Sequence, residues 1–563
     1  MLNRRDLLQV AAAAATLGAA GAGTLRQAVA KQAITQQTLL DFKPVGNVTL
    51  MHITDCHAQL TPLYFREPSI NLGVGEAAGL PPHLTGKDFM SAYKVAAGTA
   101  DAYALTSEDY VALARDYGRI GGFDRLATLV KAIRAERPDR TLLLDGGDSV
   151  QGSWTALQTK GADMARALKA LGVDAWTGHW EFTYGADRVK AIAEELGAPF
   201  LCGNVKDTEW NEDVFESTAY FERGGVKIAV IGQAFPYTPV ANPRYMIPTW
   251  SFGIREDAMR DRVKEARAKG AGLVVVLSHD GFDVDRKLAS RVEGIDVLLT
   301  GHTHDAVPEA VRVGRTLLIS SGSHGKFLSR LDLDVRNGEV KDYAFRLIPV
   351  LSDAIAPDAE MASLVEELRK PFLPELTKVA GKSGSLLYRR GNFNGTWDDL
   401  ICQALLEQRD SEISLSPGFR WGSTLLPGQD ITHEDVYNQT AITYPNAYRS
   451  EMTGQQIKDI LEDVADNLFN PDPYYQQGGD MVRVGGLGYS IDVAKPVGSR
   501  IGELTLLKSG KAVEAGKSYV VSGWASVNEG TQGPPVWDVV IKHIEKHKVI
   551  EVPDQSPIKV RGV

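Results

Sequence analysis

The chain contains five short runs of branched apolar residues, each of which ends abruptly at polar residues. Runs of this length, bounded by glycine and polar residues, are typical of buried strands. In α/β sheets the ligand crevice lies beyond the carboxyl ends of the strands, so five such endings predict one shared site. The runs and the residues that follow them are 48–54 with Asp55-Cys-His57, 141–144 with Asp145-Gly-Gly-Asp148, 174–177 with Gly178-His179, 273–278 with His279-Asp280, and 295–300 with Gly301-His-Thr-His304.

Segments with helical spacing of apolar residues separate these strands. Helices are expected at 124–136, 164–171, 186–196, 255–269 and 284–292, and further strands at 200–202, 226–232 and 316–321. The alternation of strands and helices predicts a layered α/β domain over residues 48–350. A long insertion between His57 and Gly121 is expected to be partly helical and to lie over the site, because loops of this length are usually functional or disordered.

The pattern changes after residue 350. Residues 353–378 have helical spacing, which predicts a linker helix within 351–380. Beyond it, helices are expected at 397–407 and 454–467 among short strands separated by glycine and proline. We therefore expect a smaller α+β domain over residues 381–563.

Composition narrows the class of protein. At 563 residues the chain is too long for a single hydrophobic core. Its net charge of −10 argues against nucleic acid as the main partner, because phosphate backbones select basic surfaces. Three widely spaced cysteines provide neither a disulfide framework nor a thiolate cluster, so metals would be held by nitrogen and oxygen.

The N-terminus resembles a twin-arginine export signal, which we place at residues 1–30. Arg4-Arg5 precedes a segment rich in alanine and glycine that runs to about Gly23. A membrane anchor is the alternative, but the segment falls short of the ~20 strongly apolar residues that a span needs. We expect a periplasmic protein without a membrane span, exported in the folded state.

The residues at the strand ends have the character of a two-metal site. Asp55 and His57 are at alternate positions beyond a strand, so both side chains could face one ion. Asp148 lies in a tight glycine turn, and its two carboxylate oxygens could bridge two ions. The remaining nitrogen ligands would be His279, His302 and His304.

The order of these motifs resembles that of the calcineurin-like metallophosphoesterases, and the two-domain layout is similar to that of the 5′-nucleotidases. The resemblance implies an N-terminal metallophosphoesterase-like domain and a C-terminal 5′-nucleotidase-like domain that binds substrate. It also implies two ligand sets that share the bridging aspartate. The first ion would take Asp55, His57, Asp148 and His304, and the second would take Asp148, His179, His279 and His302.

One motif departs from the family pattern. Where the family has Gly-Asn-His-Glu-Phe-Asp, this chain has Gly178-His-Trp-Glu-Phe-Thr183. Trp180 thus replaces the catalytic histidine and Thr183 replaces its aspartate partner, a pair that protonates an alkoxide leaving group. The loss argues against ordinary phosphate-ester hydrolysis. An inactive homologue is the alternative, but it does not explain why every metal position holds a competent ligand.

The variant motif, the export signal and the segment 478–486 resemble the SoxB thiosulfohydrolases of the periplasmic sulfur-oxidation pathway. The resemblance implies two manganese ions, although ligand type alone leaves zinc and iron open. The implied substrate is a cysteine S-thiosulfonate on the SoxYZ carrier protein. A metal-bridging hydroxide would attack the sulfonate sulfur and release sulfate. The departing sulfur anion needs little protonation, which fits the missing acid.

Residues that neutralise the sulfonate oxygens are expected in both domains. The 5′-nucleotidases supply an arginine from a Gly-Gly-x-Arg turn, which matches Arg420 in this chain, although Pro417 replaces the first glycine. We expect Arg420 and His179 to act in catalysis, and Arg420, Arg483 and Trp180 to bind substrate. A periplasmic 5′-nucleotidase or UDP-sugar hydrolase is the competing function. A metal-dependent protein that binds the carrier without turnover is the other.

Overall fold

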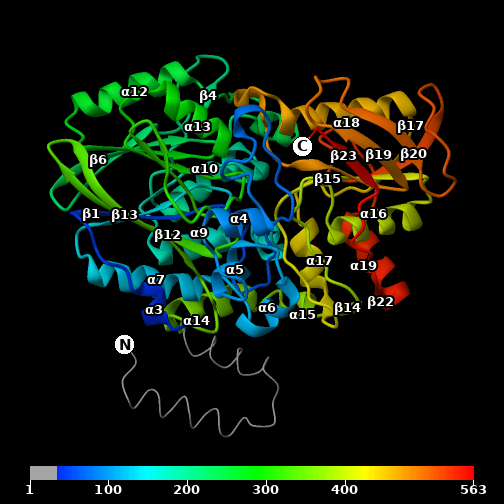
Figure 1. Cartoon of the computed structure of the whole chain (residues 1–563), viewed down its shortest axis with the longest axis horizontal. Helices are drawn as coiled ribbons and strands as arrows, with labels where there is room; N and C mark the ends of the chain where they lie inside the picture. The colour runs from blue at the N-terminus through cyan, green and yellow to red at the C-terminus, as the bar shows by residue number, and fades with distance from the viewer. Residues whose placement is uncertain (1–33, 563) are drawn as a thin grey trace, which may run out of the picture.

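The computed structural model describes residues 34–562, which form two domains side by side (Figure 1). The predicted export signal at residues 1–30 lies outside this range. Within it, the structure contains no helix with the length and hydropathy that crossing a membrane requires. The N-terminal domain is coloured blue to green in Figure 1, and the C-terminal domain yellow to red.

Two sheets packed face to face form the core of the N-terminal domain. Their strand orders are β13-β12-β1-β2-β3 and β10-β11-β9-β8-β6-β5, and apolar residues of both sheets make up one buried cluster between them. The five predicted strand ends therefore come from two sheets, which the sequence pattern did not distinguish. The strands are β1 (Val48–Ile53), β2 (Thr141–Asp145), β3 (Ala175–Trp176), β5 (Thr218–Arg223), β6 (Val226–Gln233), β8 (Leu273–Ser278), β9 (Val297–Thr300), β10 (Val311–Val313), β11 (Thr316–Ser320), β12 (Phe327–Arg336) and β13 (Glu339–Pro349).

Helices cover the outer faces of both sheets, in the segments where helical spacing predicted them. The first sheet carries α7, and the second carries α12 and α13. The strand predicted at 200–202 is wrong, because only a single bridge joins Phe200 to Trp176 before the chain turns at Cys202. The helices are α3 (Gln36–Leu40), α7 (Phe123–Glu136), α8 (Trp154–Thr159), α9 (Ala162–Leu171), α10 (Ala186–Leu196), α11 (Thr238–Ala241), α12 (Glu256–Ala268) and α13 (Phe282–Arg291), and a small ribbon pairs β4 (Lys206–Asp207) with β7 (Trp250–Ser251).

The insertion after His57 is partly helical, as expected, and contacts both domains. It contains α4 (Gly86–Ala92), α5 (Ala100–Leu105) and α6 (Tyr110–Tyr117). Its backbone donates hydrogen bonds to the C-terminal domain, from Arg66 to Thr424 and from Leu72 to Asn392. The insertion is thereby held beside the cleft between the domains.

The predicted linker helix is broken in two. Helix α14 (Ala359–Arg369) ends before Pro371, and a short helix α15 (Leu373–Leu376) follows. Proline lacks the amide proton that an internal helix position donates, so a continuous helix through Pro371 would lose a hydrogen bond. The chain then enters the C-terminal domain.

The C-terminal domain combines four helices with three small sheets, as an α+β fold. Its helices are α16 (Thr396–Arg409), α17 (His433–Thr440), α18 (Gly454–Phe469) and α19 (Val536–His547). Its strands are β14 (Val379–Ser383), β15 (Ile413–Gly418), β16 (Asp430–Thr432), β17 (Tyr448–Thr453), β18 (Asp480–Gly485), β19 (Leu487–Asp492), β20 (Ile501–Leu506), β21 (Ser518–Gly523), β22 (Val549–Ile550) and β23 (Ile558–Arg561).

The packing between the two N-terminal sheets should dominate the stability of that domain. Leu277 of β8 is fully buried in this layer, two residues before His279. We expect Leu277→Ala to lower the free energy of unfolding by about 2–5 kcal/mol, because it leaves a cavity that neighbouring side chains fill only partly. Urea unfolding measures this. Leu507→Ala is the control, since Leu507 is 52% exposed, and a similar loss in both variants would contradict the prediction.

Candidate metal centre

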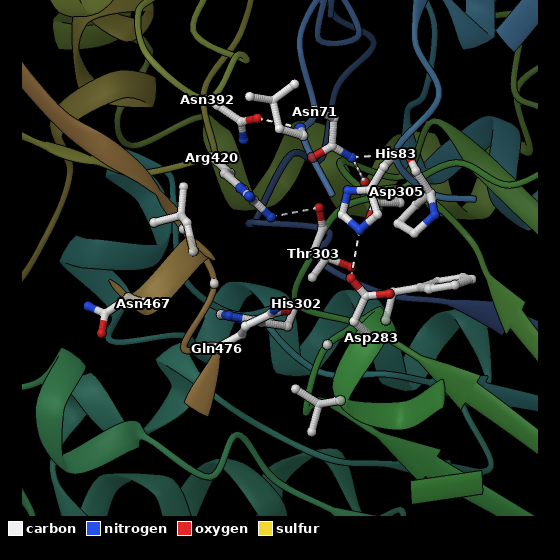
Figure 2. Close-up of a pocket in the computed structure, with 18 of the residues that line it drawn as sticks. Asn71, His83, Asp283, His302, Thr303, Asp305, Asn392, Arg420, Asn467 and Gln476 are labelled. Carbon is white, nitrogen blue, oxygen red and sulfur yellow. Dashed lines mark hydrogen bonds and ion pairs between the residues drawn. The ribbon is translucent and has the colours of Figure 1, made fainter. Parts of the chain in front are cut away.

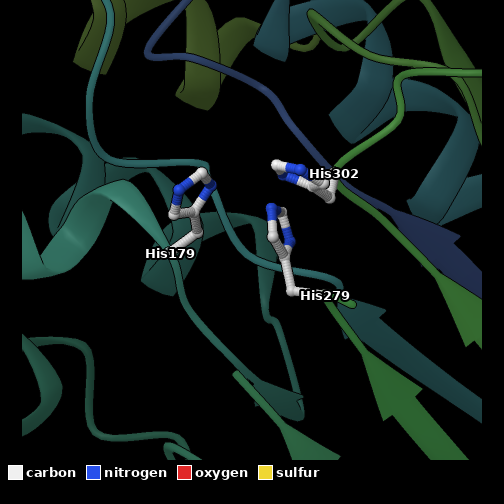
Figure 3. Close-up of side chains that lie close together, drawn as sticks. All are labelled: His179, His279 and His302. Carbon is white, nitrogen blue, oxygen red and sulfur yellow. The ribbon is translucent and has the colours of Figure 1, made fainter. Parts of the chain in front are cut away.

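The structure brings the seven predicted ligands together in two groups, in the loops that follow the strands of the two sheets. One group contains Asp55, His57, Asp148 and His304, and the other contains His179, His279 and His302, which Figure 3 shows with their rings turned toward one another. Within each group the candidate ligand atoms lie within 4.8 Å of one another. Two buried sites for an ion therefore lie close together.

Asp148 lies between the two groups. Its Oδ2 atom is 3.1 Å from His179 Nδ1, 3.4 Å from His279 Nε2 and 3.7 Å from His57 Nε2. One carboxylate oxygen is thus close to members of both groups, which is the position that a bridging ligand requires. That each residue binds an ion stays a prediction.

Five of the candidate ligands have a left-handed backbone. The φ angles are positive at Asp55, His57, Asp148, His302 and His304, between 46° and 74°. Such angles are uncommon outside glycine and cluster at functional sites, where surrounding contacts hold them. The amide of Asp55 donates to Gly147 O at 2.8 Å, and that of His57 donates to Asp148 O at 2.9 Å.

The prediction that Asp55 and His57 face the same way by strand alternation is wrong. Strand β1 ends at Ile53, so Asp55 and His57 do not share a face through strand alternation. Both turn toward the site because each has left-handed φ and hydrogen bonds to the loop that carries Asp148. Cys56 between them is fully buried and its pKa is raised, chiefly by burial, so it is a structural thiol.

The buried atoms of the centre fit a cation. His179 Nε2 and His279 Nε2 are buried and, within residues 34–562, have no hydrogen-bond partner. Leaving a buried polar atom unpartnered costs about 1–3 kcal/mol, which a metal ion would offset. Nitrogen and carboxylate donors of this kind suit manganese, zinc and iron.

The electrostatics of the centre lead to the same conclusion. Burial lowers the pKa of His302 and of His304 well below the ordinary value, so both are neutral, as metal ligands must be. Burial would also lower the pKa of His279, but Asp55 and Asp148 raise it to about 10. Burial raises the pKa of Asp55 to about 8. The negative charge of these buried carboxylates is thus stabilised by a nearby positive charge. Protonated His279 provides it here, and a metal ion would provide a larger one.

A second layer of hydrogen bonds orients the ligands. His279 Nδ1 lies 2.6 Å from Gly146 O, and His57 Nδ1 lies 3.2 Å from Gln151 O. With Nδ1 protonated, Nε2 of each ring is free to face an ion. Glu181 accepts from the amides of Ser149 and His179 and so joins the two ligand loops. The sequence contains this glutamate in the segment Gly178-His-Trp-Glu-Phe, but only the fold shows that it joins the two loops.

A cavity of about 240 Å³ opens from the centre and is lined by both domains. His57, Asp148, His179, His302 and His304 line it together with Trp180, Arg420 and residues 477–480. Arg420 donates through Nη1 to Thr303 O at 3.1 Å, and its Nη2 lies 3.2 Å from Asp480 Oδ1. The predicted arginine is therefore beside the candidate ligands and held in place.

Trp180 joins the two domains. It packs into the apolar core of the C-terminal domain, with ring centroids 5.1 Å from Trp421 and 5.5 Å from Phe419. Thr183 contacts Thr443 across the same interface. In the family pattern these two positions carry a histidine and an aspartate. Here Trp180 and Thr183 make an interdomain contact, and together they do not form a proton-donating pair.

Arg483 does not line the cavity, where a contact with substrate was expected. It is fully buried outside the cavity lining, with Nε 3.2 Å from Asp398 Oδ2 and Nη2 3.1 Å from Asp480 Oδ2. Both pairs keep the guanidinium inside the domain, where it holds the carboxylate that also binds Arg420. Arg483 therefore positions Asp480, and its predicted contact with substrate stays a prediction.

Sequence reasoning missed two buried residues beside the centre. Arg390 donates to Thr303 O at 3.3 Å, next to Arg420. The His324 ring is 5.4 Å from that of His57, and its Nε2 accepts a hydrogen bond from the Gly422 amide at 3.2 Å. The two consecutive arginines, 389 and 390, could have indicated a charged site in the sequence, whereas a single histidine in a loop gave no indication of one.

His302 and Arg420 also line a smaller cavity of about 50 Å³ (Figure 2). The insertion supplies part of its lining through His83, which is 2.6 Å from Asp283, and through Asn71, which donates to Asp305 at 3.1 Å. The insertion therefore reaches the site, as expected from its position in the sequence.

Comparison with known proteins agrees with this architecture. The family model for the 5′-nucleotidase C-terminal domain matches residues 382–538. The structure of the sulfate thiohydrolase SoxB of Thermus thermophilus, solved in complex with glycerol, superposes with a TM-score of 0.89 and 34% identity, over 93% of this chain and 98% of that one. A 5′-nucleotidase precursor of the same species has a TM-score of 0.72 at 21% identity, over 92% and 100% of the two chains. The bovine 5′-nucleotidase is 24% identical over 71% of this chain and 75% of its own.

Fold and site together define a hydrolase-type protein of the metallophosphoesterase and 5′-nucleotidase superfamily, with a buried cluster of candidate metal ligands. Within that superfamily, the chain belongs to the SoxB family.

The position of Asp148 predicts unequal effects on metal content. Asp148→Ala should lose both ions because its carboxylate contacts both groups, whereas His179→Ala should mainly weaken the second ion. Elemental analysis of purified protein measures this, with circular dichroism to verify folding. Asp257→Ala, which removes an exposed carboxylate, is the control. Retention of two ions by Asp148→Ala would refute the ligand assignment.

Proposed function

We propose that this protein is a dimanganese thiosulfohydrolase that releases sulfate from a cysteine S-thiosulfonate on the SoxYZ carrier protein. The likeness to SoxB over 98% of that chain supports the reaction class. The proposal depends most on one observation: Trp180 occupies the position of the family's general acid and is packed between the domains.

The chemistry of the leaving group explains how such a site can work. When bound, two cations would lower the pKa of a water molecule and supply the nucleophile. Hydrolysis breaks the bond between the sulfonate sulfur and the next sulfur, the water oxygen passes to sulfate, and the bonding electrons leave with a cysteine persulfide anion. That anion is far less basic than an alkoxide, so no side chain has to protonate it as it departs.

Arg420 and His179 are the protein groups that we expect to act on the sulfonate. Both line the cavity, from opposite domains. The Arg420 guanidinium is held by Asp480 and by Thr303 O, so its positive charge is oriented before substrate arrives. Fixed charges of this kind stabilise oxyanions without reorganising during the reaction.

The shape of the cavity favours a substrate on an extended arm. The candidate ligands are almost fully buried, and both domains wall the cavity. A cysteine on the surface of a folded carrier could not reach them, whereas one on a flexible peptide could. Such a peptide would contact the walls along its length, and those contacts could raise the rate as well as the affinity. Export through the twin-arginine pathway would place the enzyme in the periplasm.

The missing acid predicts poor nucleotidase activity. With Trp180 and Thr183 in place of the histidine and aspartate, the metal-loaded protein should hydrolyse AMP roughly 10²–10⁴-fold more slowly than an enzyme that retains general acid catalysis. Phosphate release measures this, with a 5′-nucleotidase of the same fold as the reference. Efficient AMP turnover would support the competing nucleotidase function.

Loss of the oriented arginine predicts a specific defect. With a short peptide bearing Cys-S-thiosulfonate as substrate, Arg420→Ala should lower turnover by roughly 10²–10³-fold, as expected for one preorganised oxyanion partner. Metal content should not change. Arg315→Ala is the control because Arg315 is 82% exposed. Turnover of Arg420→Ala near that of the control would remove Arg420 from the site.

A further inference from the structure

A second cluster of metal-ligand side chains lies in the C-terminal domain. It contains Glu407 on α16 and His543 and His547 on α19, two helices that pack together and provide none of the candidate ligands described above (Figure 1). The candidate ligand atoms of these three residues lie within 4.8 Å of one another. The three side chains are therefore close enough together to contact one ion.

The helix geometry brings the two histidines onto one face. His543 and His547 are four residues apart on α19, so their side chains are neighbours, and their ring centroids are 4.4 Å apart. Glu407 Oε2 contacts His543 Nδ1 and lies 3.0 Å from His547 Nε2. His543 is only 7% exposed, so packing restricts its ring before any ligand binds.

Two helix ends and a carboxylate bring negative charge to the cluster, part of which Lys546 neutralises. Glu407 is in the last turn of α16 and His547 is the last residue of α19, so the C-terminal ends of both helices meet here. Helix C-termini carry partial negative charge, to which Glu407 adds a carboxylate. Lys546 contacts the other oxygen, Oε1, which leaves Oε2 to the two imidazoles.

We infer that Glu407, His543 and His547 form a binding site for a first-row transition cation such as zinc. Two imidazoles and one carboxylate are a common ligand set for zinc, and they leave the fourth tetrahedral position to water. Calcium and magnesium are poor candidates because they select oxygen ligands. The bound ion would tie the end of α19 to α16 and so brace the domain that carries Arg420.

The test compares the whole protein with a variant that keeps the metal centre intact. Wild type and His547→Ala are incubated with zinc chloride, desalted and analysed for zinc per chain. Because both share the metal centre, the difference between them reports the second cluster. Wild type should hold one more zinc ion. Its affinity for that ion should exceed that of the variant by more than about tenfold, since even an outer partner of a ligand contributes roughly 10–100-fold.

Two further variants and a stability measurement sharpen the test. Glu407→Gln should lose the same ion as His547→Ala. His433→Ala should retain it, because His433 contacts the carboxylate of Glu375 at 2.7 Å but belongs to none of the metal-ligand groups found in residues 34–562. Zinc should raise the melting temperature of wild type more than that of His547→Ala. Equal zinc contents in wild type and His547→Ala would overturn the site, and binding without a difference in melting temperature would overturn the brace.

Discussion

The candidate metal centre depends on one buried carboxylate, that of Asp148. Its Oδ2 atom lies between 3.1 and 3.7 Å from three imidazole nitrogens that come from both N-terminal sheets and the loops after them. A carboxylate so deeply buried requires nearby positive charge, because desolvation disfavours its ionised form. The two sheets must therefore pack in one fixed arrangement that places their ligand loops around this atom. Metal binding and the folding of these loops should be strongly coupled.

The C-terminal domain completes the site through a network of buried charges. Asp480 binds Arg420 through one oxygen and Arg483 through the other, and Arg420 in turn donates to the loop that carries His302 and His304. Removing one partner of a buried ion pair leaves an uncompensated charge, so the loss of one member of this network should be strongly destabilising. The domains are further joined by Trp180, which packs into the core of the opposite domain. The position at which the family pattern has a histidine thus holds a residue that contacts the other domain.

Much of the site could be predicted from the sequence because its ligands lie directly after apolar strands. The helices and most strands followed from local periodicity in the same way. The long hairpin β12–β13 escaped notice because its first strand buries Arg330 and Asp332, which interrupt the apolar pattern but satisfy each other as an ion pair at 3.1 Å. Charged side chains that pair inside a protein cannot be recognised from spacing alone.

Other features depend on tertiary structure and could not be predicted. The left-handed backbone at the ligands is imposed by hydrogen bonds between separate loops. Arg420 and Arg483 both lie near glycine residues, yet Arg420 lines the cavity, whereas Arg483 is fully buried and pairs with Asp398 and Asp480. In the sequence only Arg420 matches the family's arginine turn, and that Arg483 is buried away from the cavity is seen only in the structure.

The central claim is that water attacks the sulfonate sulfur of a carrier-bound thiosulfonate and that a persulfide departs. The most direct test is a single turnover of manganese-loaded protein, in ¹⁸O-labelled water, with a peptide bearing Cys-S-thiosulfonate, followed by mass spectrometry of both products. The account predicts sulfate that contains one oxygen atom from the solvent and a peptide that retains its sulfane sulfur as a persulfide. Sulfate without solvent oxygen, or a peptide that stays unmodified while AMP is hydrolysed, would contradict it.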